Sequence, residues 1–169
     1  FLSEAIDGVN YNFVTTDNYT VNVSSGTASF NNVVIKQGIP STLNFTVDST
    51  TNPSYTFEIP ETNVDTTSLV VTVQASGSNT ASQVFTQTSD FLTLTSSDAV
   101  YFLQESLTGT YQIYFGNGVL GQQLVDGNIV NVSYIVTQGT SSAGANNFVL
   151  MDTISGYSNN SVYPITSAN

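Results

Sequence analysis

The alternation of apolar and polar residues at every second position is the feature that most constrains this chain. In residues 19–23 and 43–47, each odd position is apolar and each even position is polar. Because successive side chains of an extended strand point to opposite faces, this period of two predicts strands with one buried face. No segment of a dozen residues has the spacing of an amphipathic helix. The same strand pattern recurs at residues 55–59, 69–73, 111–115 and 130–136.

Turn-like clusters of Gly, Asn, Ser and Pro separate these runs, so that strands recur about every 8–12 residues, as in antiparallel sandwiches and barrels. We therefore predict an all-β fold, an antiparallel β-sandwich or barrel-like modules with little helix. The segment DSTTNPS at 48–54 is the expected seam. It would separate an N-terminal β segment, residues 1–50, from a main antiparallel β domain, residues 51–169, although so short a seam also allows one continuous unit.

The charge of the chain is strongly one-sided. Twelve Asp and Glu residues stand against the single basic residue Lys36, which gives a formal net charge of −11. Nucleic-acid binding depends on Lys and Arg displacing counterions from phosphates, and anionic membranes attract basic segments, so we expect neither as a partner. The sequence contains no apolar run near the roughly 18 residues that cross a bilayer. It also contains no Cys, which removes disulfides and thiol chemistry.

Residues 115–128, FGNGVLGQQLVDGN, spell the Gly-x-Gly-x-x-Gly of a dinucleotide-binding turn. Such a turn needs a helix that begins within the motif and an acidic residue about 20 positions later. A strand pattern follows instead, and the later region is neutral, so we predict a glycine-rich hairpin connection and no cofactor. Calcium needs six to eight oxygen ligands, and no such spacing surrounds the second turn. The residues expected to set the turn geometry are Gly116, Asn117, Gly118, Gly121, Asp126 and Gly127.

Candidate catalytic residues are limited to carboxylates, because the chain has no His, Cys or Arg. Glu58, Glu61 and Asp65 cluster in FEIPETNVD, and paired carboxylates can hydrolyse glycosides. However, Glu58 falls on the polar face of its strand and Glu61 follows Pro60 in a turn, so nothing places two of them across a cleft. We therefore predict that the chain is not an enzyme. A carboxylate-only hydrolase remains the third hypothesis.

Several individually weak motifs follow one another in a fixed order between Phe30 and Phe148. A strand ends in a glycine turn, and further glycine turns lead into a strand with a Val-x-Val-x-Tyr core. The residues in this order are Phe115, Gly116, Asn117, Gly118, Gly121, Gly127, Asn128, Val130, Val132, Tyr134, Thr137, Gly139 and Asn146. Together with IP…VD…SLVVTV at 59–73, the order resembles the baseplate wedge protein of T-even-type contractile-tailed bacteriophages and the related J-like baseplate proteins. The family often has Asp where this chain has Asn117.

The resemblance implies a structural role in the virion. It suggests a β-rich part of a longer subunit, assembled in the host cytoplasm, that contacts other baseplate wedge subunits, including copies of itself. Such a component forms rings and helps couple host contact to sheath contraction. The alternative hypothesis is an extracellular adhesin or carbohydrate-binding β-sandwich, in which Tyr114 or Tyr157 would stack on sugars. The absence of Trp, which such platforms commonly use, weighs against that alternative.

Overall fold

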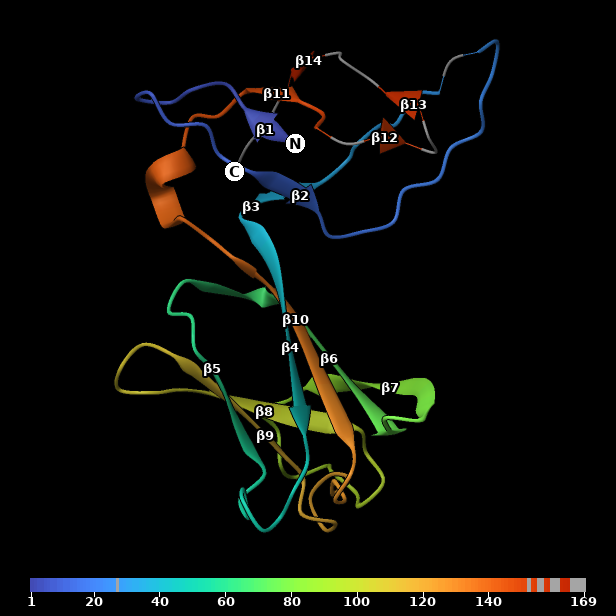
Figure 1. Ribbon diagram of the computed structural model, residues 1–169, viewed down its shortest axis with the longest axis vertical. Coiled ribbons are helices and arrows are strands. Elements are labelled where there is room, and N and C mark those ends of the chain that lie inside the picture. The colour runs from blue at the N-terminus through green and yellow to red at the C-terminus, as the bar shows by residue number, and fades with distance from the viewer. Residues whose placement is uncertain (27, 152, 155–156, 159–161, 165–169) are drawn as a thin grey trace. The chain divides into compact units, whose positions relative to one another are not determined.

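The computed structural model describes residues 1–26, 28–151, 153–154, 157–158 and 162–164 (Figure 1). The chain divides into two compact units. Unit 1 consists of Phe1–Ile39 together with Thr137–Asn169, and unit 2 consists of Pro40–Val136. Both ends of the chain thus belong to one unit, and the second unit is a single continuous stretch between them.

This division differs from the one expected at residues 48–54. That segment lies inside unit 2, where it is a turn closed by the Asn52 N–H donating to the Asp48 carbonyl at 2.9 Å. Unit 1 is discontinuous because β11 (Asn147–Val149) pairs with β1 (Leu2–Ser3) in antiparallel register. A pairing between segments so far apart in sequence leaves no local change in composition, so a search for linkers does not find it.

Unit 1 is built from short strands. Its sheets have the orders β1-β11-β14, β2-β3 and β12-β13. The one regular helix among its described residues is the 3-10 turn η1 (Gly139–Ser142). The Phe148 side chain is fully buried and meets the Phe13 ring edge to face, with ring centroids 4.7 Å apart. The remaining strands are β2 (Phe13–Thr15), β3 (Ile35–Gln37), β12 (Thr153–Ile154), β13 (Tyr157–Ser158) and β14 (Val162–Pro164).

The prediction of a strand at residues 19–23 is wrong. These residues adopt no regular structure, and the Val21 and Val23 side chains are 39% and 68% exposed. Alternation stabilises a strand only where a neighbouring strand and a buried face are present. Neither is found for this segment in the described part of unit 1.

Unit 2 is one seven-stranded sheet with the order β4-β10-β6-β7-β8-β9-β5. Its strands are β4 (Ile39–Thr46), β5 (Thr56–Ile59), β6 (Val64–Ser76), β7 (Asn79–Gln87), β8 (Val100–Glu105), β9 (Tyr111–Phe115) and β10 (Ile129–Val136). Five of the six predicted alternating segments lie in these strands, and the predicted all-β, barrel-like fold is confirmed. β4 and β10 run in opposite directions, since Thr42 lies beside Ser133 while Val47 lies beside Asn128.

One pairing departs from the expected antiparallel arrangement. β7 and β8 are parallel, and only Thr86 and Gln87 of β7 take part, opposite Val100 and Tyr101. A parallel pair needs a crossover connection of about a dozen residues. Residues 88–99 form that connection, so a long irregular segment here accompanies a change of strand direction.

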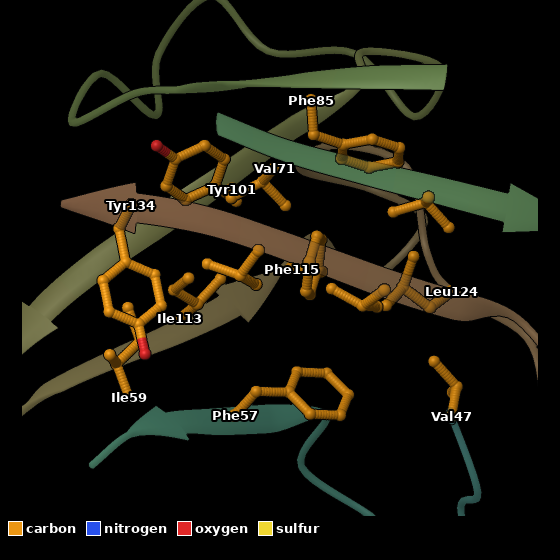
Figure 2. Close-up of a cluster of buried hydrophobic side chains, with 13 residues drawn as sticks. Val47, Phe57, Ile59, Val71, Phe85, Tyr101, Ile113, Phe115, Leu124 and Tyr134 are labelled. Carbon is orange, nitrogen blue, oxygen red and sulfur yellow. The ribbon is translucent and has the colours of Figure 1, made fainter. Parts of the chain in front are cut away.

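Aromatic side chains close the sheet toward a barrel. The Phe45 ring on β4 and the Phe57 ring on β5 lie 5.0 Å apart, which joins the two strands at opposite ends of the sheet order. Inside, the Phe115 ring meets Phe57 at 5.9 Å and Phe85 at 5.4 Å (Figure 2). The core contains Val47, Phe57, Ile59, Val71, Val73, Phe85, Tyr101, Ile113, Phe115, Leu124, Val130, Val132 and Tyr134.

Candidate functional site: the loop end of unit 2

Three connections gather at one end of the barrel, and we call residues 47–55, 88–99 and 116–128 the loop end (Figure 1). Backbone hydrogen bonds tie them together. The Gly121 N–H donates to the Thr95 carbonyl at 3.0 Å, and the Gly127 N–H donates to the Val47 carbonyl at 2.9 Å. The stretch 116–128 is therefore fastened to both of the other connections.

The stretch 116–128 was expected to be a hairpin connection, and that expectation is wrong. It joins β9 to β10, but β9 pairs with β8 and β5 whereas β10 pairs with β4 and β6. The connection therefore crosses from one part of the barrel to another. On its way it inserts Leu124, which is 2% exposed, into the core beside Val47 (Figure 2). It caps this end of the hydrophobic core.

Gly116 and Gly121 are required by a close approach of two backbone segments. A Cβ on Gly116 would lie 2.3 Å from the Gly121 carbonyl carbon and 2.5 Å from the Leu120 carbonyl oxygen. Gly121 has φ +83°, and a Cβ there would lie 2.8 Å from Val100 Cγ2. The first and last glycines of the Gly-x-Gly-x-x-Gly spelling thus touch one another, and no helix begins there to hold a pyrophosphate.

Asn117 and Gly118 form a turn between those two glycines. The Asn117 Oδ1 accepts the N–H groups of Val119 and Leu120, each at 3.0 Å. The turn is closed by the Gly118 N–H, which donates to the Gly121 carbonyl at 3.1 Å, and Gly118 has φ +81°. Both Asn117 and Gly118 therefore serve the local backbone.

Asp126 and Gly127 form the second turn. Asp126 Oδ1 accepts the Ser49 N–H at 2.8 Å, and its Oδ2 accepts the Ser49 hydroxyl at 2.7 Å. The buried Asn128 completes the anchor, since its Oδ1 accepts the Val125 N–H at 2.9 Å and its Nδ2 donates to the Ala75 carbonyl at 3.0 Å. The turn signal Asp126-Gly127 could be predicted from the sequence, but the anchoring role of Asn128 had no distinguishing signal.

Asp98 holds the start of β8 in place. Its Oδ2 accepts the Thr95 N–H at 2.6 Å and the Thr95 hydroxyl at 2.8 Å, and these two bonds lower the pKa of the carboxyl below its ordinary 3.8. Asp48 is comparable, because hydrogen bonds from the Thr50 hydroxyl and then the Thr50 N–H lower its pKa. Both carboxyls are exposed and organise turns of the loop end.

These lowered pKa values predict that the loop end loses stability in acid. The contribution is complete above the ordinary carboxyl pKa and disappears as the pH falls through the lower folded-state value. We expect the melting temperature to fall between about pH 5 and pH 2, and to fall less in an Asp48→Asn, Asp98→Asn double variant. Thermal melts followed by circular dichroism would measure this. An equal acid sensitivity of the variant and the parent chain would contradict the assignment.

The carboxylates considered for hydrolysis have separate partners. Glu58 accepts the Thr110 hydroxyl at 2.8 Å, and Glu61 accepts the Tyr134 hydroxyl at 2.6 Å. Burial, together with this bond to Glu61, raises the pKa of Tyr134. Asp65 accepts both the N–H and the hydroxyl of Thr67 at 3.0 and 2.6 Å. Each carboxylate thus has a structural hydrogen bond of its own.

Within the described ranges, no group of three or more His, Cys, Asp or Glu residues is placed to hold a metal ion. Nor does any helix in the part of the chain that the structure describes have the length and apolar character needed to cross a membrane.

The loop end is among the parts of the chain that expose large apolar side chains. Leu92 is 97% exposed, Val119 70% and Val125 61%. The sequence offered no period that would mark them as exposed, because they lie in irregular segments. Exposed apolar side chains mark a partner contact where they gather into one patch, so these three residues are the ones to test at the loop end.

Tyr114, proposed from the sequence as a sugar platform, takes part in an aromatic stack. Its ring lies 5.1 Å from the Phe102 ring at an interplanar angle of 21°, and Phe102 in turn stacks on Phe91 at 4.8 Å and 10°. One face of Tyr114 is thereby covered. The side chain of the other candidate, Tyr157, lies outside the described residues.

No family model matches the chain. No curated protein matches it either.

Proposed function

We propose that this chain is a structural component of a phage tail baseplate wedge that mediates subunit assembly and ring formation around the tail hub. The observation that carries the proposal is the construction of residues 116–128. Their glycine, Asn and Asp residues are used for backbone geometry, while Val119 and Val125 project into solvent. The same stretch holds most of the residues that resemble the wedge family.

The charge of the chain supports an assembly role. A net charge of −11 keeps free copies apart at long range and favours partners with a complementary surface. The partners in this proposal are other wedge subunits and further copies of the full-length protein. The proposed location is the virion, after assembly in the host cytoplasm.

Immunogold labelling of virus particles tests this role. An antibody raised against the chain is expected to label the baseplate end of the tail in particles of the virus that encodes it. Labelling of the surface of intact host cells, with none on particles, would instead favour the adhesin alternative. In that case the half-exposed Phe91 ring, stacked on Phe102, is the surface to test for glycan binding.

The loop end can be tested separately. Replacing Leu92 and Val119 with serine should weaken incorporation into wedges by about tenfold or more, because each exposed apolar side chain loses the area it would bury. Leu107→Ser is the matched control, since Leu107 is fully exposed but lies in the turn before β9, at the other end of that strand. Incorporation would be measured by quantitative mass spectrometry of purified wedges. Equal incorporation of all three proteins would contradict a docking role for the loop end.

A further inference from the structure

β7 has an open edge. Along Asn79–Phe85 it pairs with β6 on one side, but on the other side β8 reaches only Thr86 and Gln87 (Figure 1). No other described strand of unit 2 lies against that edge. On the side away from β6, β7 therefore has seven residues without a neighbouring strand, a length of about 23 Å at roughly 3.3 Å per residue.

The direction of its free backbone groups follows from the short pairing with β8. The Thr86 N–H donates to the Ala99 carbonyl and the Thr88 N–H donates to the Tyr101 carbonyl, both at 3.0 Å. Backbone N–H and C=O groups alternate in direction along a strand. Ser82 and Val84 therefore direct their N–H and carbonyl groups outward along the same edge, whereas Thr80 lies at the register shift of the β6–β7 ladder.

This edge lacks several of the usual protections against pairing with another chain. Natural edges carry charged residues, proline, a β-bulge or a covering segment. The register of the β6–β7 ladder shifts between the pairs Gln74–Ser82 and Ser76–Asn79, so one irregularity lies near the start of β7. From Thr66 to Ser89 the sequence contains no charged residue and no proline. Residues 79–84 are all exposed, and Val84 is 59% exposed. The two ends of the sheet order, β4 and β5, meet through Phe45 and Phe57.

We propose that β7 is a self-association edge, pairing in antiparallel register with β7 of a second copy so that one sheet continues across the dimer. A twofold axis at Gln83 places each Ser82 opposite Val84 of the other copy. All the outward N–H and carbonyl groups of these two residues then find partners. Gly77 and Ser78, in the turn before β7, are small and leave room for the neighbouring chain.

The edge is neutral although the chain carries −11 overall. A basic partner would therefore find no carboxylate to pair with in the stretch of 24 neutral residues, 66–89. Two copies that each carry −11 can meet here without placing like charges in contact. The remaining repulsion is long-range, so added salt should strengthen the dimer. The inference rests on the assembly role proposed above, for which it supplies a self-contact.

Sedimentation equilibrium of the purified 169-residue chain tests the edge. The mass should rise from 18.0 kDa toward twice that value with concentration, and at lower concentration in high salt. Ser82→Pro removes one outward N–H from each copy while leaving the β6–β7 bonds intact, since proline is tolerated on an edge. It should weaken the dimer by about tenfold or more. A monomer at every concentration and salt would overturn the proposal.

A charge variant provides a second test with a matched control. Ser82→Lys places the two lysines diagonally across the twofold axis, about 7–8 Å apart between the strands, and should also weaken the dimer. Val70→Lys makes the same change in net charge at an exposed position of β6, which has neighbours on both sides, and should not. Circular dichroism would verify that the variants fold. Dimers as strong in both Ser82 variants as in the parent chain would show that another face is used.

Hydrogen exchange locates the contact, and the outcomes separate the two proposals. The amides of Ser82 and Val84 should become protected as concentration rises. Dimers in which these amides exchange freely would refute the edge. A monomeric chain whose antibody still labels baseplates would refute the edge and leave the wedge role intact. A dimer through β7 without any labelling of particles would support the edge and refute the wedge role.

Discussion

Gly116→Ala is expected to destabilise unit 2 by about 3 kcal/mol, the upper part of the range for overpacking a well-packed region. The added Cβ would lie 2.3 Å from the Gly121 carbonyl carbon and 2.4 Å from its oxygen. Both are backbone atoms, so no side chain can rotate away, and the crossing segment itself must move. Because that segment inserts Leu124 into the core, the movement would loosen the packing there as well. Urea denaturation would measure the loss.

Gly127→Ala is the matched control for this prediction. Gly127 has φ +88°, but an added Cβ would meet no atom within 4 Å. Its substitution should therefore cost only the left-handed backbone penalty, about 1–2 kcal/mol. Gly121→Ala combines a positive φ with a contact to Val100 and should cost more than Gly127→Ala. If Gly116→Ala were no more costly than Gly127→Ala, the close approach would not matter for stability.

The glycines illustrate what the sequence could predict about the candidate site. Asn117-Gly118 and Asp126-Gly127 are local turn signals, and the structure places turns at both. Gly116 does not have positive φ, and its need for glycine arises from a segment five residues away folding back on it. The sequence also could not show that β9 and β10 pair with different neighbours, because strand order depends on contacts between distant segments.

Whether the sequence pattern identified a strand depended on how the faces of that strand are buried. Alternation found β4, β5, β6, β9 and β10, each with one face in the core. It missed β8, in which Val100, Tyr101 and Phe102 are all buried in succession. Phe102 is covered on the outer face by Phe91 from the crossover connection. A strand buried on both faces has no period of two, so the pattern that identifies half-buried strands does not apply.

β7 was missed for the opposite reason. Of its nine residues only Phe85 is buried, and the rest are exposed. With almost no apolar face, it has little alternation to detect, and its strand character comes from the ladder with β6. The same absence of a buried face, combined with the absence of charge, is what makes its free edge available to a second copy.

Phe57→Ala is expected to cost about 3–5 kcal/mol, the range for removing a buried phenylalanine side chain. The ring is 5% exposed and lies between Phe45 on β4 and Phe115 on β9. Its loss would leave a cavity at the place where the two ends of the sheet order meet. We therefore expect the amides of β4 and β5 to exchange faster, and by more than those of β6 and β10. Urea denaturation and hydrogen exchange would measure the two effects.

Phe91→Ala provides the comparison. It also removes a stacked phenylalanine, but Phe91 is 47% exposed and lies on the outer face of β8, so the cost should be about 1 kcal/mol. The two variants thus remove the same side chain from inside and outside the barrel. Equal costs, or a uniform rise in exchange across the sheet for Phe57→Ala, would mean that the Phe45–Phe57 contact does not close the barrel. A local opening of β4 and β5 would show that these rings, rather than a continuous hydrogen-bond ladder, join its two ends.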